Sequence, residues 1–267
     1  MRVATFNLAS GRGAGPVHLP VDRVRAALAS LRADVVCLQE VDVAQPRSHG
    51  THQVEVAAEA MGTPYWRFVP TLAGTPSPVR GWHRVHPDAA HGHDGSDGSD
   101  GGNGRPLYGV AVLSRRPVRD WHVLELGHGR GGLPLRAPDP FTGADRWWWI
   151  PDEPRVAVAA ELDDCTVVST HLSFSPPTAV RQLRLLRRWA AGLRAPVIVA
   201  GDLNLPGQLP ARLLGLRRLV AAPTFPGDRP RIQLDHVLGP AGVTAHRPAV
   251  ERLDVGDHRA VSVTLRW

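Results

Sequence analysis

Residues 197–204 read Val-Ile-Val-Ala-Gly-Asp-Leu-Asn, an apolar run that ends in a carboxylate and an amide. A short apolar run bounded by Gly-Asp is typical of a buried β-strand. The segment 35–40 repeats the arrangement, since Val-Val-Cys-Leu-Gln ends in Glu40, and Val-Val-Ser-Thr at 167–170 ends in His171. The pattern predicts rigid strands that carry functional groups at their carboxyl ends.

Outside these stretches, apolar runs of strand length outnumber helical ones. Runs rich in Val, Ala and Leu predict strands near 2–8, 34–39, 65–70, 107–114, 118–125, 154–162, 165–171, 196–200, 233–238, 243–252 and 259–266. Helical periodicity predicts helices near 21–32, 51–61, 177–193 and 208–219. Many strands are consecutive, which does not fit a doubly wound sheet. We therefore expect an α/β fold in which two mixed β-sheets pack face to face with helices on the outside.

Two segments rich in Gly and Pro interrupt this pattern. Residues 71–106 contain a Gly/His/Asp-rich stretch with almost no apolar residues, which predicts a flexible surface loop. Residues 127–153 predict a second loop that ends in Trp147-Trp148-Trp149. These Trp side chains could stack on bases or anchor at a lipid interface. We expect instead a hydrophobic plug over a sheet edge, because two prolines follow at once.

The charge of the chain is modest and carried by one kind of cation. All 31 basic residues are Arg, against 25 acidic residues, for a formal net charge of +6. Guanidinium groups bind phosphate in bidentate fashion, so an Arg-rich surface favours polyanions. A GC-rich coding bias also produces such a composition, and this excess is small for a dedicated nucleic-acid binder. We attribute most of the Arg content to the coding bias.

The sequence also bears on compartment and assembly. Cys37 and Cys165 lie in apolar stretches, which predicts reduced, buried thiols. The N-terminus has no apolar core of signal-peptide length, and no stretch approaches the apolar length of a membrane span. We expect a full-length, cytoplasmic monomer without a transmembrane segment, folded as one domain over residues 1–267, because chemical motifs lie on both sides of each loop.

Functional groups at strand ends form a chemically coherent set. The set comprises Asn7, Glu40, His171, Asp202, Asn204, Asp235, Asp257 and His258. Glu40 and Asp257, helped by Asn7, offer hard oxygen ligands suited to Mg²⁺ or Mn²⁺. Each residue alone has an ordinary explanation as a cap, a turn residue or a core histidine. Their joint occurrence favours a metal-dependent hydrolytic site.

The same motifs resemble a known family along nearly the whole chain. They are Thr-Phe-Asn (5–7), Leu-Gln-Glu-Val (38–41), Tyr-Gly-Val-Ala-Val-Leu-Ser (108–114), Ser-Thr-His-Leu (169–172), Gly-Asp-Leu-Asn (201–204), Leu-Asp-His-Val (234–237) and Gly-Asp-His-Arg-Ala-Val (256–261). This series resembles the endonuclease/exonuclease/phosphatase superfamily, which includes deoxyribonucleases, abasic-site endonucleases, neutral sphingomyelinases and inositol polyphosphate 5-phosphatases. The resemblance implies a four-layer α/β sandwich with the site at one edge of the two packed sheets.

The resemblance also implies roles for individual residues. Glu40 would be the main ligand of Mg²⁺ or Mn²⁺, with Asn7 and Asp257 nearby. The catalytic set would be Asp202 and Asn204 on water and phosphate, His258 paired with Asp235, and His171 on the scissile phosphate. Arg155 and Tyr108 are weaker candidates for substrate contacts. Pancreatic-type deoxyribonucleases pair their first active-site His with a Glu, and we identify no such Glu for His171.

These roles predict in-line attack of water on a phosphate ester. An attacking water needs no nucleophilic Ser or Cys, and a His–carboxylate pair can serve as base or phosphate-binding cation. We expect a nuclease, with a phosphodiesterase or phosphatase for a lipid or small-molecule phosphate as the alternative. Two readings of another class are a non-catalytic binding module with this fold and an unrelated α/β binding protein whose strand-end polar residues are caps.

Overall fold

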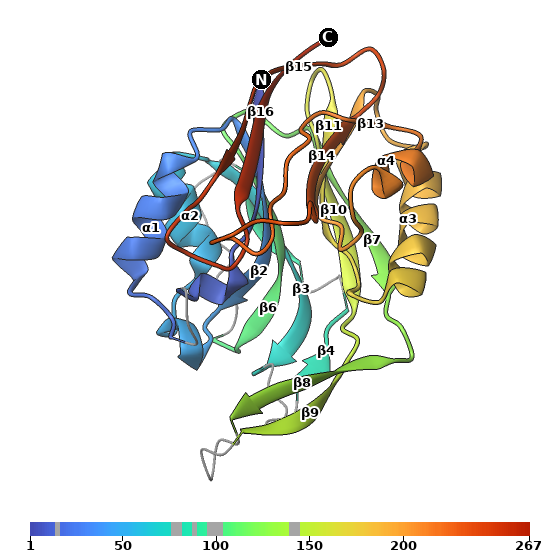
Figure 1. Ribbon diagram of the computed structural model, residues 1–267. Helices are drawn as coiled ribbons and strands as arrows, with labels where there is room; N and C mark the ends of the chain where they lie inside the picture. Colours follow the sequence, from blue (N-terminus) through green and yellow to red (C-terminus); the bar gives the residue numbers. More distant parts are fainter. Residues whose placement is uncertain (14–16, 76–81, 87–89, 95–103, 139–144) are drawn as a thin grey trace.

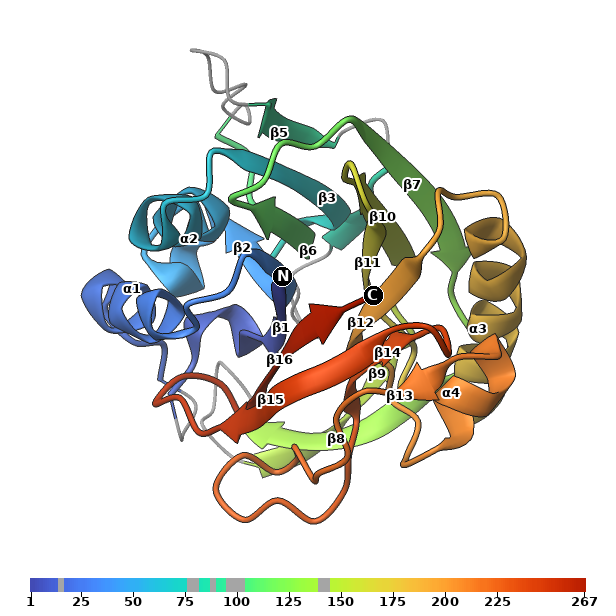
Figure 2. The same ribbon diagram turned by 90° about the horizontal axis from the view of Figure 1, so that it is seen from above.

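The computed structural model describes residues 1–13, 17–75, 82–86, 90–94, 104–138 and 145–267. Its elements form four layers, with two sheets packed face to face and a pair of helices outside each sheet (Figures 1 and 2). This arrangement confirms the predicted four-layer sandwich of two mixed β-sheets. Both chain termini lie at the same end of the sandwich (Figure 1).

The first sheet lies beneath helices α1 (Val21–Ser30) and α2 (Gln53–Met61). Its strands pair in the order β15 (Thr244–Glu251), β16 (Ala260–Arg266), β1 (Arg2–Asn7), β2 (Val35–Val43), β6 (Leu107–Ser114), β3 (Tyr65–Gly74) and β4 (Trp82–Arg84), and β5 (His91–Asp94) also pairs with β3. β1 and β2 are parallel, whereas their other neighbours are antiparallel. A buried cluster that includes Phe6, Leu28 and Val54 joins the sheet to its helices.

The second sheet lies beneath helices α3 (Pro176–Ala190) and α4 (Leu209–Leu214). Its order is β13 (Arg217–Arg218), β14 (Asp235–Gly239), β12 (Val197–Asp202), β11 (Thr166–His171), β10 (Arg155–Glu161) and β7 (Asp120–Gly127). β11 and β12 are the parallel pair of this sheet. α4 is shorter than predicted because Gly215, in the left-handed conformation, caps it and β13 follows.

The inner faces of both sheets change from apolar to polar along each parallel strand. In β1 the inward residues are Val3, Thr5 and Asn7, in accordance with the two-residue period of a strand. Gln39 of β2 accepts a hydrogen bond from Thr5 and donates one to Ser169 of the opposite sheet, at 3.2 and 3.3 Å. All these polar side chains are buried. The polar end of this layer is where the predicted functional groups lie.

The segment 71–106 is not only a loop. β3 continues to Gly74, and the described residues beyond it include β4 and β5. Both short strands pair with β3. A short stretch with few apolar residues can therefore form a strand when it pairs with the edge of a sheet that already exists. The rest of the predicted flexible loop, 76–81, 87–89 and 95–103, lies outside the described residues.

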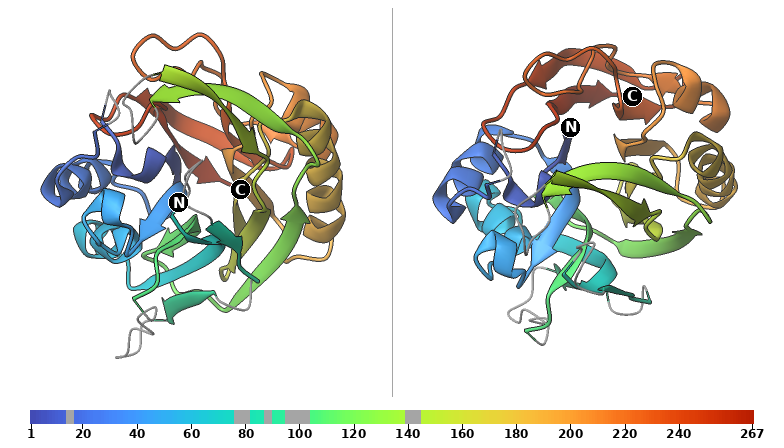
Figure 3. Two further views of the ribbon diagram at one scale, coloured as in Figure 1. Left: turned by 90° about the horizontal axis from the view of Figure 1, so that it is seen from below. Right: turned by 60° about the horizontal axis from the view of Figure 1, so that its bottom comes forward.

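The segment 127–153 contains a β-hairpin where a loop was predicted. β8 (Gly132–Pro138) and β9 (Asp145–Pro151) pair only with each other among the described strands, and the hairpin extends across the end of the sandwich opposite the termini (Figures 1 and 3). Trp147 and Trp149 are 68% and 65% exposed. The predicted plug is therefore wrong, because the strand period places both rings on an uncovered face.

A β-bulge turns Glu40 toward the interior of the sandwich. Leu38 pairs with Ala111 and Val41 with Gly109, so β2 has one residue more than β6 across this interval. Glu40 lies in the bulge with a φ of 53°, an unusual value for a residue with a side chain. Gly109 faces a second irregularity in β3, where a Cβ would lie 2.1 Å from the Val69 carbonyl oxygen. Only glycine fits between the two strands.

None of the helices in the described ranges is long and apolar enough to cross a bilayer.

We predict that Gly109→Ala lowers the free energy of unfolding by at least about 2 kcal/mol, because the added methyl collides with backbone atoms of β3. Gly192→Ala is the matched control, since its Cβ would meet only the Trp189 carbonyl oxygen at 3.5 Å. Urea unfolding followed by circular dichroism measures both. Equal stability of the two variants would contradict the proposed close approach.

Candidate active site

The Asn7 side chain joins the two sheets at their polar end. Its Nδ2 donates to Glu40 Oε1 at 3.0 Å and to Asp202 Oδ2 at 3.1 Å. Its Oδ1 accepts from the Ala9 backbone N–H at 3.0 Å, which fixes the orientation of the amide. Two carboxylates from different sheets are thus held beside one NH₂ group. Glu40 is partly exposed and Asp202 is buried, so the cluster opens to solvent on the Glu40 side.

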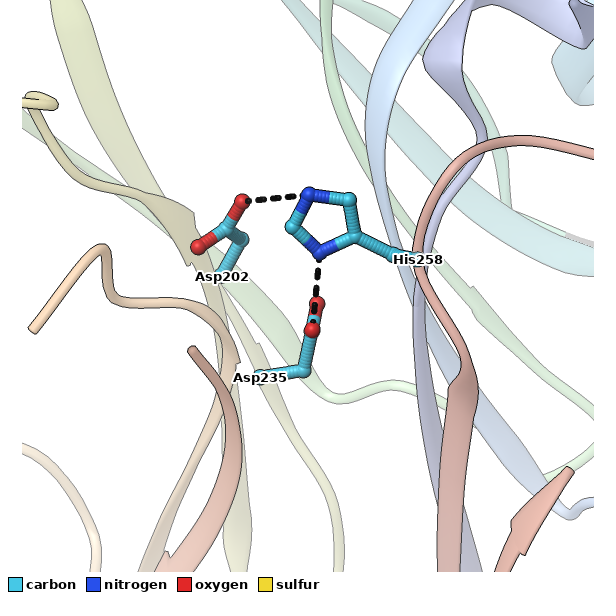
Figure 4. Close-up of side chains that lie close together, drawn as sticks. All are labelled: Asp202, Asp235 and His258. Atoms are coloured by element: carbon cyan, nitrogen blue, oxygen red, sulfur yellow. Dashed lines mark hydrogen bonds and ion pairs between the residues drawn. The ribbon is translucent and has the colours of Figure 1, made fainter. Parts of the chain in front are cut away.

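His258 lies between two carboxylates (Figure 4). Its Nδ1 is 2.8 Å from Asp235 Oδ2, and its Nε2 is 3.7 Å from Asp202 Oδ2. Burial alone would lower the pKa of His258, but Asp235 and Asp202 raise it to about 10. Burial raises the pKa of Asp202 to about 7, against the opposing charge of His258. The ring therefore carries its proton at neutral pH, and Asp202 is the group with proton-accepting capacity.

The same three residues could also hold a cation by distance alone. Each of Asp202, Asp235 and His258 offers one ligand atom within 4.8 Å of the others. Both ring nitrogens of His258 already face carboxylates, so the arrangement is that of a His–carboxylate pair, hydrogen-bonded through Nδ1 to Asp235, with Asp202 at ion-pair distance from Nε2. A Phe225 ring at a centroid distance of 4.8 Å packs against the imidazole.

His171 is held in one tautomer by Arg155. Arg155 Nη1 lies 2.9 Å from His171 Nδ1 in a buried contact. A guanidinium group only donates hydrogen bonds, so Nδ1 must be the acceptor and the proton of the neutral ring must sit on Nε2. Burial and the positive charges of Arg155 and His258 hold the pKa of His171 well below its usual range. His171 is therefore a neutral donor.

His171 Nε2 and Asn204 Nδ2 bring two N–H donors close together. Asn204 Nδ2 is 3.2 Å from His171 Nε2 and also donates to the Leu172 carbonyl oxygen at 2.9 Å. The nearest carboxylate oxygen to His171 Nε2 belongs to Asp202, at 3.6 Å. Asn204 has a φ of 49°, and its backbone N–H donates to Asp202 Oδ1 at 3.0 Å. One hydrogen of the Asn204 amide is taken by Leu172, so the second one and the His171 Nε2–H are the pair that lacks an acceptor within hydrogen-bond distance among the described residues, and this pair suits an anionic oxygen of a ligand.

Arg155 and Tyr108 are buried side chains within electrostatic reach of Glu40. Arg155 Nη2 is 3.4 Å from Glu153 Oε2. Burial, followed by the charges of Glu40 and Glu153, raises the pKa of Tyr108 well above its usual value. Burial also raises the pKa of Glu153. The hydroxyl of Tyr108 thus stays protonated near two acids.

Seven of the eight strand-end residues are linked through Asp202. They are Asn7, Glu40, His171, Asp202, Asn204, Asp235 and His258. Asp257 instead pairs with Arg12 at 3.2 Å, and its side chain is 47% exposed. The backbone before it still lies against the site, because a Cβ on Gly256 would be 3.0 Å from the Asn7 carbonyl oxygen.

The sequence did not point to Glu153, Arg12 or the Arg155–His171 contact. Most of the predicted residues follow an apolar run. β10 runs antiparallel to β11, so its amino-terminal end reaches the same edge, and Glu153 lies just before β10 begins at Arg155. Polar residues ahead of a strand therefore carry the signal for Glu153.

Two packed sheets thus carry clustered carboxylates, two amides and a His–carboxylate pair at one edge. The model of the Endonuclease/Exonuclease/phosphatase family matches residues 4–258, and the chain belongs to that family. The resemblance seen in the motifs is thereby confirmed over almost the whole chain.

Similar proteins are distant in sequence and alike in fold. An uncharacterized Escherichia coli protein, YbhP, is 26% identical over 209 residues, which cover 76% of this chain and 66% of that protein. A Beutenbergia cavernae endonuclease/exonuclease/phosphatase has a TM-score of 0.64 at 20% identity, covering 99% of this chain and 71% of that one. Sphingomyelinase C of Streptomyces griseocarneus has a TM-score of 0.54 at 18% identity, covering 98% of both chains. These structures share the fold.

We predict that His171 carries its proton on Nε2 at neutral pH, because Arg155 occupies Nδ1 as a donor. Long-range ¹H–¹⁵N correlation spectra should show a protonated Nε2 and an unprotonated Nδ1. Arg155→Met should allow tautomer exchange or protonation, whereas Arg116→Met, which removes an ion pair to the distant Asp164, should leave the His171 signals unchanged. A proton on Nδ1 in the wild-type protein would refute the lock.

We predict that stability falls as pH rises above neutrality. A histidine with a raised folded-state pKa stabilises the fold fully below its unfolded value of 6.5, and this contribution is lost as pH rises toward about 10. Between about pH 7.5 and 8.5 in EDTA, the slope should approach about 1.4 kcal/mol per pH unit. Asp235→Asn should flatten the slope, and an unchanged slope in that variant would count against the ion pair.

Proposed function

We propose that the chain is a divalent-metal-dependent phosphodiesterase that cleaves nucleic acid by in-line attack of water. The observation that carries the proposal is the Asn7 amide, which holds Glu40 and Asp202 together beside His258. Carboxylates gathered from both sheets supply ligands for a cation and a proton acceptor. The remaining N–H of Asn204 and the Nε2–H of His171 supply donors for an anionic phosphate oxygen.

The donor set fits a hard divalent cation. Glu40 is the partly exposed carboxylate of the cluster, and carboxylate oxygens are ligands that Mg²⁺ and Mn²⁺ prefer. We propose Glu40 as the principal ligand. Asn7 would join it by turning its amide to present Oδ1, and Asp257 by leaving its ion pair with Arg12. When bound, such a cation withdraws charge from a phosphate oxygen and stabilises the transition state.

The residues of the chain would then divide the remaining work. Asp202, whose pKa burial raises to about 7, accepts a proton from the attacking water. Asn204 and the neutral His171 donate to a non-bridging phosphate oxygen, and Arg155 keeps His171 in that state as a positioning residue. His258, protonated between Asp235 and Asp202, adds positive charge as the P–O bond to the leaving group breaks, and the leaving oxygen takes its proton from solvent.

The exposed Trp147 and Trp149 are compatible with two classes of substrate. Rings on the β8–β9 hairpin can stack on unpaired bases, which suits nucleic acid. The same rings could insert at a lipid interface, which favours the alternative of a lipid phosphodiester. We place nucleic acid first because an Arg-rich surface favours a polyanion over a ligand with a single phosphate. A cytoplasmic monomer is the form we propose for it.

We predict that Asp202→Asn and His258→Gln each reduce kcat by at least about 100-fold on every cleaved phosphodiester. The exposed acid Asp22→Asn on α1 is the control and should retain full activity. EDTA should abolish hydrolysis, and Mg²⁺ or Mn²⁺ should restore it. Activity that survives in EDTA, or in both site variants, would rule out the proposed chemistry.

We predict that a Trp147→Ala/Trp149→Ala double variant discriminates between the substrates. Plasmid DNA, RNA, sphingomyelin vesicles and bis-(p-nitrophenyl) phosphate are compared, with Trp267→Ala at the opposite end of the molecule as control. A rise in KM confined to single-stranded nucleic acid supports base stacking. A loss confined to vesicles supports the lipid alternative and contradicts the nuclease.

A further inference from the structure

Positive charge is concentrated on one outer layer of the sandwich. Between Asp164 and Asp228 the only acidic residue is Asp202, which is buried in the site. The same interval contains eight arginines, all exposed or partly exposed: Arg181, Arg184, Arg187, Arg188, Arg194, Arg212, Arg217 and Arg218. They lie on or beside α3, α4 and β13, and we call this surface the arginine face. A coding bias accounts for Arg in place of Lys, but not for the loss of carboxylates from one layer.

The arginine face carries no compensating charge. Within the described parts of the chain, none of the eight guanidinium groups has a carboxylate within ion-pair distance. Several donate to backbone carbonyl oxygens instead, as Arg181 does to His128 at 3.1 Å and Arg187 to Leu213 at 3.4 Å. Each guanidinium has five N–H donors, so these bonds orient the group and leave donors free.

The opposite helical layer has a different composition. On α1 and α2, Arg25 pairs with Glu59 at 2.8 Å and Arg23 with Asp254 at 3.6 Å. Asp22 and Glu55 add further negative charge there. The two outer layers have the same structural task of covering a sheet, yet only one lacks acids. Stability offers no reason for the difference, since Arg184 lies three or four residues from Arg181, Arg187 and Arg188, and like charges at this spacing destabilise a helix.

The arginine face is continuous with the active-site edge. α3 begins at Pro176, shortly after His171 ends β11, and Arg181 bonds the carbonyl oxygens of Leu126 and His128 where β7 leads into the β8–β9 hairpin. From there Arg184 and Arg188 continue along the 15-residue helix, about 22 Å at 1.5 Å per residue. The described part of α3 presents no exposed large apolar side chain that could insert into a membrane.

We propose that the arginine face binds the phosphate backbone of a nucleic acid whose reacting strand lies at the active site. The proposal deepens the proposed function and rests on it for the identity of the polyanion. A chain of regularly spaced phosphates running along α3 would meet Arg181, Arg184 and Arg188 in turn, and each contact would release bound counterions. Affinity would then depend on duplex length and fall steeply with salt.

The test compares Arg184→Gln/Arg188→Gln with a matched control, Arg23→Gln/Arg25→Gln on α1, which removes the same formal charge. Fluorescence anisotropy with a labelled duplex of about 20 base pairs, in EDTA to prevent cleavage, is measured over a salt series. We expect the α3 variant to bind at least about tenfold more weakly and to lose about 2 from the log–log salt slope, whereas the control matches the wild type. Thermal unfolding verifies that both variants are folded.

Equal affinity and slope in the two variants would overturn the proposal, even if DNA is cleaved in Mg²⁺. Selective loss of binding in the α3 variant supports it, and absence of DNA cleavage would then refute only the nuclease. Vesicles containing phosphatidylglycerol form the third arm. If the α3 variant loses vesicle binding but keeps DNA affinity, the face is a membrane surface and the proposal is wrong.

Discussion

The structure depends on a cross-sheet contact made by one amide. Asn7 ends a strand of the first sheet, and its NH₂ group touches Glu40 in that sheet and Asp202 in the other. Two carboxylates drawn together from separate sheets repel each other unless a donor or a cation lies between them. The bulge, the positive φ values of Glu40 and Asn204, and the buried Thr5–Gln39–Ser169 bridge all serve to bring these groups to one edge.

Much of this architecture could be predicted because it follows from periodicity. Apolar runs located the long strands and the four α-helices of the described residues, and the polar residues in or beside these runs located seven linked residues. The strands that the sequence did not predict were missed for physical reasons. β4 and β5 were missed because a short strand on an existing edge needs little apolar character of its own. The β8–β9 hairpin was missed because its Trp rings were assigned to an interior that they do not enter.

The Arg155–His171 contact determines the tautomer of His171, which could not be predicted from either residue alone. The sequence shows only that a histidine stands at the strand end. Whether Nδ1 carries the proton depends on whether its partner is an accepting carboxylate or a donating guanidinium. Sequence spacing gives no access to that choice, because the two residues are brought together by antiparallel pairing of β10 with β11. Asp257 shows the converse, since a residue adjacent to His258 turned outward to Arg12.

The unequal charge of the two helical layers gives the molecule an electric polarity across its sheets. Near a long anionic surface, such a charge distribution exerts a torque before any atoms touch, turning α3 inward and α1 outward. The protein would then reach the anionic surface already oriented, and would have to find its binding position only by moving along that surface. Encounter would become faster at low ionic strength through orientation alone, independently of the chemistry at the sheet edge.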